Sequence, residues 1–414
     1  MQTLDSPIMV QESPLRKRIA GWSTPREPDT QTVAGRPGAA RGSRVEPPRV
    51  QYVAYGRAGE ETPTAGCELV ATLGDLESEY AAVRRGAGLL DSPHRATIHI
   101  TGSDRRDFLN RMVTQELKDL DAGAVRQTFW LNRRGRIVAD LLLAEMGDHV
   151  LACLDVHGAV KAVESLREFL FTEDVEITEA TDTYHHLALH GPQAAEVIAV
   201  AGDDPDLPDL PDLACKTLEV GGNKVAVIRC DQTGGPGFEL IMPRADAEAV
   251  WDALLAAGRT LGDGRPRVRP IGWHAFNIAR IEAGTPLFNI DFGTDSLAHE
   301  TSLIAQRVSF TKGCYLGQEI VARTENLGRP KQRLVGLRPD HNLLPAAGAD
   351  VMDADGKAVG AVTSSTLSPM LGAVPIAFAM IRHAALEGPV RVAAEGELTD
   401  AVIVGLKFHE VKAS

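Results

Sequence analysis

The amino-acid sequence predicts an α+β fold in more than one domain, with a small β-barrel at the C-terminus. Three observations lead to this prediction. The chain has 414 residues, which is more than one hydrophobic core usually serves. Helical patterns alternate with pairs of short apolar runs typical of antiparallel strands, rather than with the regular repeat of a parallel sheet. After Arg329 and Pro330 the pattern changes to short β runs separated by Gly, Pro and Asp.

The N-terminal region, residues 1–50, is rich in Pro, Arg, Gly and Ser and shows neither helical nor strand periodicity. Such a segment buries too little apolar surface to order itself. We therefore predict a disordered tail that can be deleted without loss of ligand binding.

The next region, residues 51–328, is expected to hold two related α+β subdomains. A first helix carries Leu76, Tyr80 and Val83 on one side and is expected to stop near Gly86 and Gly88. Strands are expected over 96–102, 124–132, 137–146, 149–156 and 175–180, and the middle three are expected to be linked by hairpins. Helices are expected over 103–120 and 160–171. Residues 184–200 repeat the plan of strand, Gly-containing turn and helix. Three more strands are expected over 216–220, 224–230 and 238–243, followed by a helix over 246–258.

The last region, residues 329–414, is expected to form the barrel. Its apolar runs are short and lie at 333–339, 349–353, 358–365, 377–382, 389–394 and 400–408.

Composition limits the classes of function. A net charge of -13 argues against a general nucleic-acid binder, because phosphate recognition needs clustered Lys and Arg. No stretch reaches the roughly 18 apolar residues of a membrane helix, so we expect neither nucleic acid nor a membrane as a direct partner.

The five cysteines are widely spaced, without a CxxC or Cys/His cluster of the kind that holds zinc. We expect no metal site and a cytoplasmic location, where thiols stay reduced.

The segment SFTKGCYLGQEIVART, residues 309–324, contains the most distinctive cysteine of the chain. Cys314 follows Gly313, and glycines permit tight turns that expose a thiol. Lys312, two positions earlier, would favour the thiolate. Cys314 is therefore a candidate nucleophile or redox group. The alternative is a small buried hydrophobic residue, the commoner fate of a lone cysteine.

This segment resembles the K-G-C-Y-x-G-Q-E signature of the YgfZ family, which is related to the glycine-cleavage T-protein. The fixed positions of the signature are Lys312, Gly313, Cys314, Tyr315, Gly317, Gln318 and Glu319. The similarity extends from about residue 74 to residue 408. It implies three subdomains around a central channel that binds tetrahydrofolate or another reduced folate. It also implies a role in supporting iron-sulfur proteins or their assembly factors, including enzymes that thiolate tRNA, with Cys314 as the key thiol.

The resemblance also implies the folate site. Asp140, in LNRRGRIVADLLL, stands where aminomethyltransferases place an aspartate close to the reactive pterin nitrogen, so it is a candidate catalytic residue with Cys314. Glu239 stands where a carboxylate holds the pterin ring, and Phe238 and Arg280 are expected to join the same site. Residues 280–292 are expected to form a strand and a turn before the signature.

Each of these residues also has a plainer interpretation. Asp140 could pair with one of the nearby arginines, which are Arg133, Arg134 and Arg136. Glu239 could face solvent, since Phe238 and Glu239 alternate on a strand and periodicity does not choose between them. His185 and His186 invite a metal or base hypothesis, but adjacent residues of a strand point to opposite faces, so a structural role is expected for the pair.

Two departures weaken a transferase interpretation. The transferases of the superfamily have Tyr-Thr-Gly-Glu where this chain has Gln232, Thr233, Gly234 and Gly235. They also have an arginine at the position of Phe276, and they lack the signature cysteine. The leading hypothesis is a folate-binding protein that supports iron-sulfur proteins, the alternative is a folate-dependent aminomethyltransferase, and the third is a folate-binding scaffold without chemistry.

Overall fold

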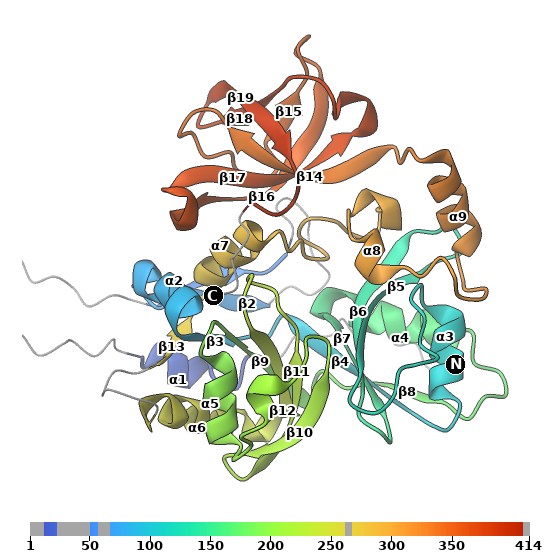
Figure 1. Ribbon diagram of the computed structural model, residues 1–414, viewed down its shortest axis with the longest axis vertical. Helices are drawn as coiled ribbons and strands as arrows, with labels where there is room; N and C mark the ends of the chain where they lie inside the picture. Colours follow the sequence, from blue (N-terminus) through green and yellow to red (C-terminus); the bar gives the residue numbers. More distant parts are fainter. Residues whose placement is uncertain (1–11, 23–49, 57–66, 261–266, 409–414) are drawn as a thin grey trace, which may run out of the picture.

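The computed structural model describes residues 12–22, 50–56, 67–260 and 267–408. Two sheets lie side by side and a barrel sits across one end of them (Figure 1). This arrangement confirms the predicted α+β class with a C-terminal barrel. No helix within the described ranges is long and apolar enough to cross a membrane.

The first sheet has five strands in the order β5-β6-β7-β4-β8. Its strands are β4 (Arg95–Thr101), β5 (Val125–Leu131), β6 (Ile137–Glu145), β7 (Val150–Asp155) and β8 (Glu176–Glu179). Helices α3 (Arg105–Met112) and α4 (Ala159–Arg167) supply apolar faces to the core on one side of this sheet, where Phe108 and Leu166 are fully buried. The neighbouring strands pair antiparallel, as the hairpin pattern predicted.

The second sheet has six strands in the order β10-β11-β12-β9-β3-β13. Its strands are β3 (Ala87–Asp91), β9 (Tyr184–His190), β10 (Cys215–Val220), β11 (Asn223–Arg229), β12 (Gly237–Pro243) and β13 (Val268–Ile271). Helices α2 (Leu76–Arg85), α5 (Ala194–Ala201) and α6 (Ala247–Thr260) pack with it. Helix α2 ends at Arg85 with Gly86 as its C-cap, as expected, and the chain then continues directly into β3, which pairs parallel with β13.

The facing sides of the two sheets form a core of their own. Three of the cysteines, Cys153, Cys215 and Cys230, are buried there among aliphatic side chains. Residues two apart on a strand share a face. Alternate residues of β7 and β12 therefore point into this layer, and the residues between them point into the cores on the far sides of the sheets.

The expectation of a disordered tail is wrong for residues 12–22. These residues contain α1 (Arg16–Ala20), and Leu15 and Ile19 are buried in the core beneath α5 and α6. The hydroxyl of Ser13 donates a hydrogen bond of 2.6 Å to Asp91, which ties the segment to β3. Two apolar side chains one turn apart give too short a pattern for periodicity to detect. The rest of the predicted tail lies outside the described residues, apart from Val50.

Replacing Leu15 with Asp is expected to detach α1 from the domain. The change removes about 2 kcal/mol of apolar burial and places an unpaired charge in the core. Trypsin should then cleave at Lys17 and Arg18 many times faster than in the wild type. Leu398→Asp serves as the control, since that leucine is 50% exposed. Unchanged cleavage in Leu15→Asp would show that the segment does not depend on this contact.

A two-stranded sheet and three helices connect the larger parts. Strands β1 (Gln51–Ala54) and β2 (Glu68–Thr72) pair antiparallel. Helix α7 (Trp273–Ala283) lies between the second sheet and the barrel, and α8 (Ile304–Arg307) and α9 (Gln318–Leu327) follow it (Figure 1). The expected strand over the first part of 280–292 is therefore wrong, since Arg280 to Ala283 form the last turn of α7. Gly284 ends that helix with φ 78°, which a side chain would disfavour.

The barrel is closed, with strand order β14-β17-β16-β15-β18-β19. Its strands are β14 (Gln332–Pro339), β15 (Asp350–Met352), β16 (Ala358–Ser368), β17 (Val374–Arg382), β18 (Val390–Ala394) and β19 (Glu397–Val404). Closure removes the exposed edges that short strands would otherwise present. Helix α9 ends at Leu327 and β14 begins at Gln332, so the expected boundary at 328/329 falls between them.

Candidate functional site

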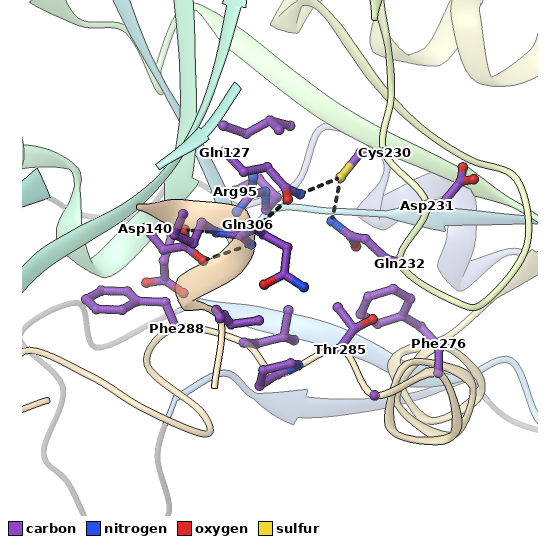
Figure 2. Close-up of a pocket in the computed structure, with 18 of the residues that line it drawn as sticks. Arg95, Gln127, Asp140, Cys230, Asp231, Gln232, Phe276, Thr285, Phe288 and Gln306 are labelled. Carbon is purple, nitrogen blue, oxygen red and sulfur yellow. Dashed lines mark hydrogen bonds and ion pairs between the residues drawn. The ribbon is translucent and has the colours of Figure 1, made fainter. Parts of the chain in front are cut away.

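A cavity of about 510 Å³ lies where the two sheets, the end of α7 and helix α8 meet (Figure 2). Its wall combines carboxylates, amides, cations and two phenyl rings. The polar and aromatic members are Tyr55, His94, Arg95, Gln127, Asp140, Asp155, Asp212, Asp231, Gln232, Phe276, Thr285, Phe288, Gln306, Arg307 and Lys407. An enclosure of this size with a few convergent polar groups is the usual form of a small-molecule site.

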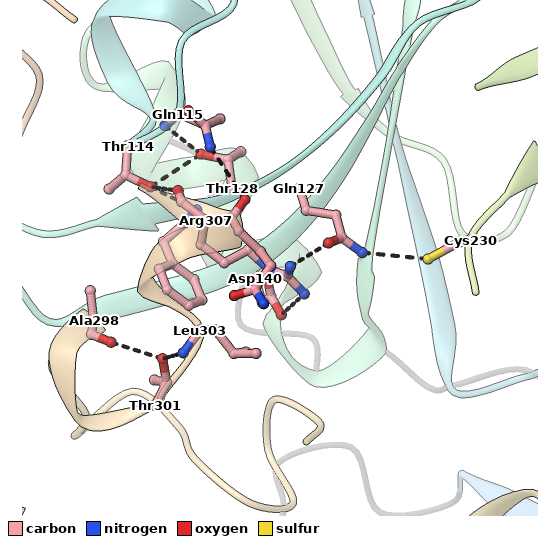
Figure 3. Close-up of polar contacts among 12 residues, drawn as sticks. Thr114, Gln115, Gln127, Thr128, Asp140, Cys230, Ala298, Thr301, Leu303 and Arg307 are labelled. Atoms are coloured by element: carbon pink, nitrogen blue, oxygen red, sulfur yellow. Dashed lines mark hydrogen bonds and ion pairs between the residues drawn. The ribbon is translucent and has the colours of Figure 1, made fainter. Parts of the chain in front are cut away.

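Asp140 is on this wall, as expected, and its partner is Arg307 (Figure 3). Nε of Arg307 donates to Oδ1 of Asp140 at 2.8 Å, and the two side chains are only 12% and 15% exposed. The plainer interpretation named Arg133, Arg134 or Arg136 as the partner, and it is wrong because Arg307 makes the ion pair. Since the carboxylate faces the cavity, a bound molecule would meet the Asp140–Arg307 pair rather than a lone charge.

Helix α8 holds Arg307 in this position. The hydroxyl of Thr114 donates to the carbonyl of Arg307 at 2.6 Å, and the amide of Phe129 on β5 donates to that hydroxyl at 3.0 Å. Gln127 accepts a hydrogen bond from the guanidinium and donates to the sulfur of Cys230 at 3.5 Å. A chain of contacts therefore runs from Asp140 to Cys230 along one side of the cavity (Figure 3).

Two further carboxyl groups of the wall bind protons more tightly than usual. Burial raises the pKa of Asp155, against hydrogen bonds from Tyr55 at 2.5 Å and Asn289 at 2.7 Å. Burial, with the charge of Asp231 beside it, raises the pKa of Asp212. A cavity that combines an arginine-paired carboxylate with more basic carboxyl groups can both hold a positive charge and exchange a proton.

Glu239 is not on the cavity wall formed by the described residues. It is 5% exposed on β12, and Nε of Arg95, which is on the wall, donates to its Oε1 at 2.6 Å. We expected Glu239 to contact a pterin ring in the cavity directly. This expectation is not met, because Arg95, the partner of Glu239, is the residue on the wall. The expectation for Phe238 is wrong, since this residue points to the other face of β12 and is 1% exposed in the core under α5 and α6.

Arg280 is also not part of the cavity wall, contrary to expectation. Its side chain is fully buried and forms an ion pair with Asp291. It donates to Ser364 of β16 at 2.6 Å and to the carbonyl of Thr285 at 3.2 Å, and its guanidinium lies over the ring of Phe378. These contacts use the guanidinium to join α7 to the barrel, which is a structural role.

The signature segment spans the connection between α8 and α9 and continues into α9, away from the cavity wall. Cys314 is exposed, in agreement with the expected accessible thiol. Lys312 is buried, and its ammonium donates to the carbonyls of Asn110, Val113 and Gln115 at 2.6, 2.8 and 2.7 Å. Burial lowers the pKa of Lys312 to about 8. The ammonium thus satisfies carbonyl groups at and just beyond the C-terminal end of α3. The expectation that it activates Cys314 is not supported by these contacts.

Other signature residues build the loop itself. Tyr315 is buried in a core with Phe292 and Val321. Gly317 has φ 81°, and a side chain there would meet the carbonyl of Asn132 at 2.9 Å. Gln318 and Glu319 begin α9, while Gly313 has open space around its backbone.

Cys314 is expected to be alkylated first among the five cysteines. The other four are buried, and burial raises the pKa of their thiols, to about 12 for Cys67 and Cys230, to about 11 for Cys215 and well above its usual value for Cys153. Access and thiolate fraction together control the rate. Brief treatment with limiting iodoacetamide and mass-spectrometric mapping should find most of the label on Cys314. First labelling of a buried cysteine would contradict the described burial.

Sequence reasoning missed Arg307, Gln127, Arg95 and Gln306. Arg307 and Gln306 end a four-residue helix, which is too short to give a periodic signal. Gln127 belongs to a strand whose burial pattern gives no simple alternation. Arg95 lies within residues 74–408, over which the resemblance extends, but no motif singled it out.

The fold and the cavity define a class of protein with two facing α+β subdomains and a barrel around a small-molecule site. Residues 65–325 match the model for the GCVT N-terminal domain, and residues 332–410 match the glycine cleavage T-protein C-terminal barrel domain. The chain belongs to the glycine cleavage T-protein family.

Individual relatives agree with this assignment. An aminomethyltransferase of Caldanaerobacter subterraneus subsp. tengcongensis is 30% identical over 349 residues, which is 84% of this chain and 91% of the relative. An aminomethyltransferase of Geobacillus kaustophilus is 32% identical over 366 residues, 86% of this chain and 97% of the relative. The crystal structure of glycine cleavage system aminomethyltransferase T from Bartonella henselae is 26% identical, with a TM-score of 0.75 over 87% of this chain and 94% of that chain.

The residues of the cavity suit a reduced folate. Phe276 and Phe288 offer apolar surfaces for flat rings, and Gln127 and Gln306 offer donors and acceptors for ring nitrogen and oxygen atoms. Lys407 offers a cation for a carboxylate. These features match the chemistry of a pterin linked to a glutamate.

Proposed function

We propose that this protein is a tetrahydrofolate-dependent one-carbon transferase of the aminomethyltransferase type. The observation that carries the proposal is the Asp140–Arg307 pair on the wall of the 510 Å³ cavity. The relatives named above are called aminomethyltransferases, and they align along most of both chains. This similarity supports the transferase hypothesis better than the hypothesis that the protein supports iron-sulfur proteins.

Tetrahydrofolate, when bound, would supply the nitrogen that accepts the one-carbon unit. Asp140 would stabilise positive charge that develops next to that nitrogen, because a carboxylate held by Arg307 keeps a fixed position on the wall. Asp155 or Asp212 would hold a proton during the transfer, since the pKa of each is raised by burial.

The donor of the one-carbon unit is proposed to differ from that of the superfamily's transferases. Gln232, Gly234 and Gly235 line the cavity, and so does Phe276. At these positions the resemblance placed, in the same order, a tyrosine, a glycine, a glutamate and an arginine. The wall therefore lacks an acidic and a basic side chain that the resemblance placed there, which favours a less charged aminomethyl donor.

The test is to incubate purified protein with tetrahydrofolate and a panel of aminomethyl donors, whose one-carbon unit is already at the oxidation level of formaldehyde, and to measure methylenetetrahydrofolate and the ammonia that leaves. Formation of that product with at least one donor is the expected result. Absence of product with every donor, despite tight tetrahydrofolate binding, would reject the transferase and leave a binding protein.

A second candidate function is the support of iron-sulfur proteins through Cys314. It is favoured by one observation: buried Tyr315 and Lys312 anchor the loop, and Cys314 is presented outward. The partner would be an iron-sulfur protein or an assembly factor that contacts the thiol. Complementation of a strain that lacks its YgfZ-type protein, under oxidative stress, should then fail with Cys314→Ala. That variant should keep full folate transfer, which separates the two functions.

A further inference from the structure

The layer between the two sheets contains a cluster of three side chains of the kind that bind metal ions. They are Cys153 on β7, His186 on β9 and Glu239 on β12. One ligand atom from each side chain lies within 4.8 Å of the other two, and all three residues are buried. No such cluster can be seen in the sequence, because the ligands come from three strands and two sheets.

Strand register explains why these residues meet. His186 is opposite Ile241 on β12, so Glu239, two residues earlier, is its diagonal neighbour on the same face. On the other sheet Cys153 is opposite Thr97 of β4. The hydroxyl of Thr97 lies 2.7 Å from Nε2 of His186, so the faces that carry these residues are in direct contact.

Two buried atoms of the cluster have no hydrogen-bond partner in the part of the chain that the structure describes. They are Nδ1 of His186 and Oε2 of Glu239, and His186 and Glu239 are 1% and 5% exposed. A buried polar atom without a partner is costly, so each such atom calls for an occupant. The other atom of each side chain is held, Nε2 by Thr97 and Oε1 by Arg95.

This arrangement is the one that metal sites use to orient their ligands. A ligating histidine or carboxylate usually keeps its second atom in a hydrogen bond, which fixes the side chain and leaves the first atom free for the ion. Mixed sulfur, nitrogen and oxygen ligands are typical of zinc.

We propose that Cys153, His186 and Glu239 bind one zinc ion between the two sheets. The Cys153 thiol releases its proton to solvent when the Zn–S bond forms, and no electron transfer is involved. Zinc bonds of about 2.0–2.3 Å in a tetrahedral arrangement place ligand atoms about 3.3–3.8 Å apart, so side-chain movements of about 1 Å complete the site. The charge of Glu239 is balanced by Arg95, and the thiolate offsets part of the charge of the ion.

The proposal goes beyond the one-carbon chemistry and does not depend on it. Such an ion would join β7 of one sheet to β9 and β12 of the other, next to Arg95 of the cavity wall. Zinc should therefore raise the temperature of unfolding, because a ligand that binds only the folded chain stabilises it.

The experiment uses the full chain with Cys314→Ser as the parent, so that the exposed thiol binds no metal. After removal of metal with a chelator, zinc is titrated by calorimetry, and cobalt(II) is used as a spectroscopic probe. One zinc ion per chain, a higher Tm with zinc and a sulfur-to-cobalt absorption band are expected. Adding Cys153→Ser should abolish the band, and Cys153→Ser or His186→Gln should each weaken zinc binding more than about 100-fold, since outer-shell partners alone contribute 10–100-fold.

Cys215→Ser is the matched control, because Cys215 is a buried cysteine of the same core but is not one of the three ligands. It should leave the stoichiometry and the absorption band unchanged. If the parent binds no zinc at micromolar concentration, or if Cys153→Ser and His186→Gln bind it as well as the parent, the proposed site is wrong. The measurement on the parent needs no variant at the cluster, so the result does not depend on whether those variants fold.

Discussion

Asp140→Asn is expected to lower the rate of tetrahydrofolate-dependent one-carbon transfer by about 10²–10³-fold, the usual range for losing one group that stabilises charge in the transition state. The affinity for tetrahydrofolate should change only a few-fold. The amide keeps the shape of the carboxylate and can still accept a hydrogen bond from Arg307, but it no longer offers a negative charge to the reacting centre. Steady-state kinetics with the best donor, combined with calorimetric titration of tetrahydrofolate, separate the two effects.

Two controls distinguish chemistry from structure. Asp121→Asn changes a carboxylate that is 87% exposed and should leave the rate unchanged. The double variant Asp140→Asn, Arg307→Gln removes both charges of the pair. If Asp140 only balanced Arg307, the double variant would recover the wild-type rate. Recovery, or a wild-type rate in Asp140→Asn itself, would remove Asp140 from the reacting centre.

Mild acid is expected to destabilise the fold steeply, through His94 and His190. Burial lowers the pKa of His94 well below 6.5 and that of His190 to about 4. Because the folded-state values lie below the unfolded value, the unfolded chain takes up protons first as the pH falls. Stability is therefore complete above pH 6.5 and is lost toward pH 4, by up to about 3 kcal/mol per pH unit for the two groups together.

The measurement is urea unfolding at pH 7.0 and pH 5.5 at constant ionic strength, in the wild type and in His190→Phe. Neither ring nitrogen of His190 has a hydrogen-bond partner among the described residues, and the ring stacks on Phe276 at 5.2 Å. A phenyl ring keeps that contact and cannot be protonated. His190→Phe should therefore lose less stability between the two pH values, by about 1.4 kcal/mol per pH unit. Identical losses in both proteins would contradict the burial of a neutral His190.

The fold could be predicted from the sequence where single elements carry clear patterns. Helix α2 and the hairpins of the first sheet follow from local periodicity and turn residues. Strand β3 and helix α1 could not be predicted, because each depends on partners that are distant in the sequence. Ala87 to Asp91 become a strand by pairing with β9 and β13, and Leu15 becomes buried by packing beneath α5 and α6.

The site was only partly predictable for the same reason. A motif located Asp140, but its partner Arg307 is 167 residues away and no local pattern connects them. Phe238 and Glu239 alternate on a strand, so only one of them can face a given site. The structure places Phe238 in the core under α5 and α6. Arg280 needed the positions of Asp291 and Ser364 before its structural role became visible.

The central claim is that a reduced folate binds in the cavity between the three subdomains. Gly235 lines this cavity, and its backbone leaves open space where a side chain would begin. Gly235→Trp should therefore fill part of the cavity without disturbing the fold. Gly313 also has open space around it but lies in the exposed signature loop, so Gly313→Trp is the matched control.

Calorimetric titration of tetrahydrofolate into the wild type and both variants tests the claim most directly. The expected result is a loss of affinity of at least about 100-fold in Gly235→Trp, because an indole would occupy the space of the ligand. Gly313→Trp should bind like the wild type. Wild-type affinity in Gly235→Trp, with its fold intact by circular dichroism, would contradict the account and place the ligand outside this cavity.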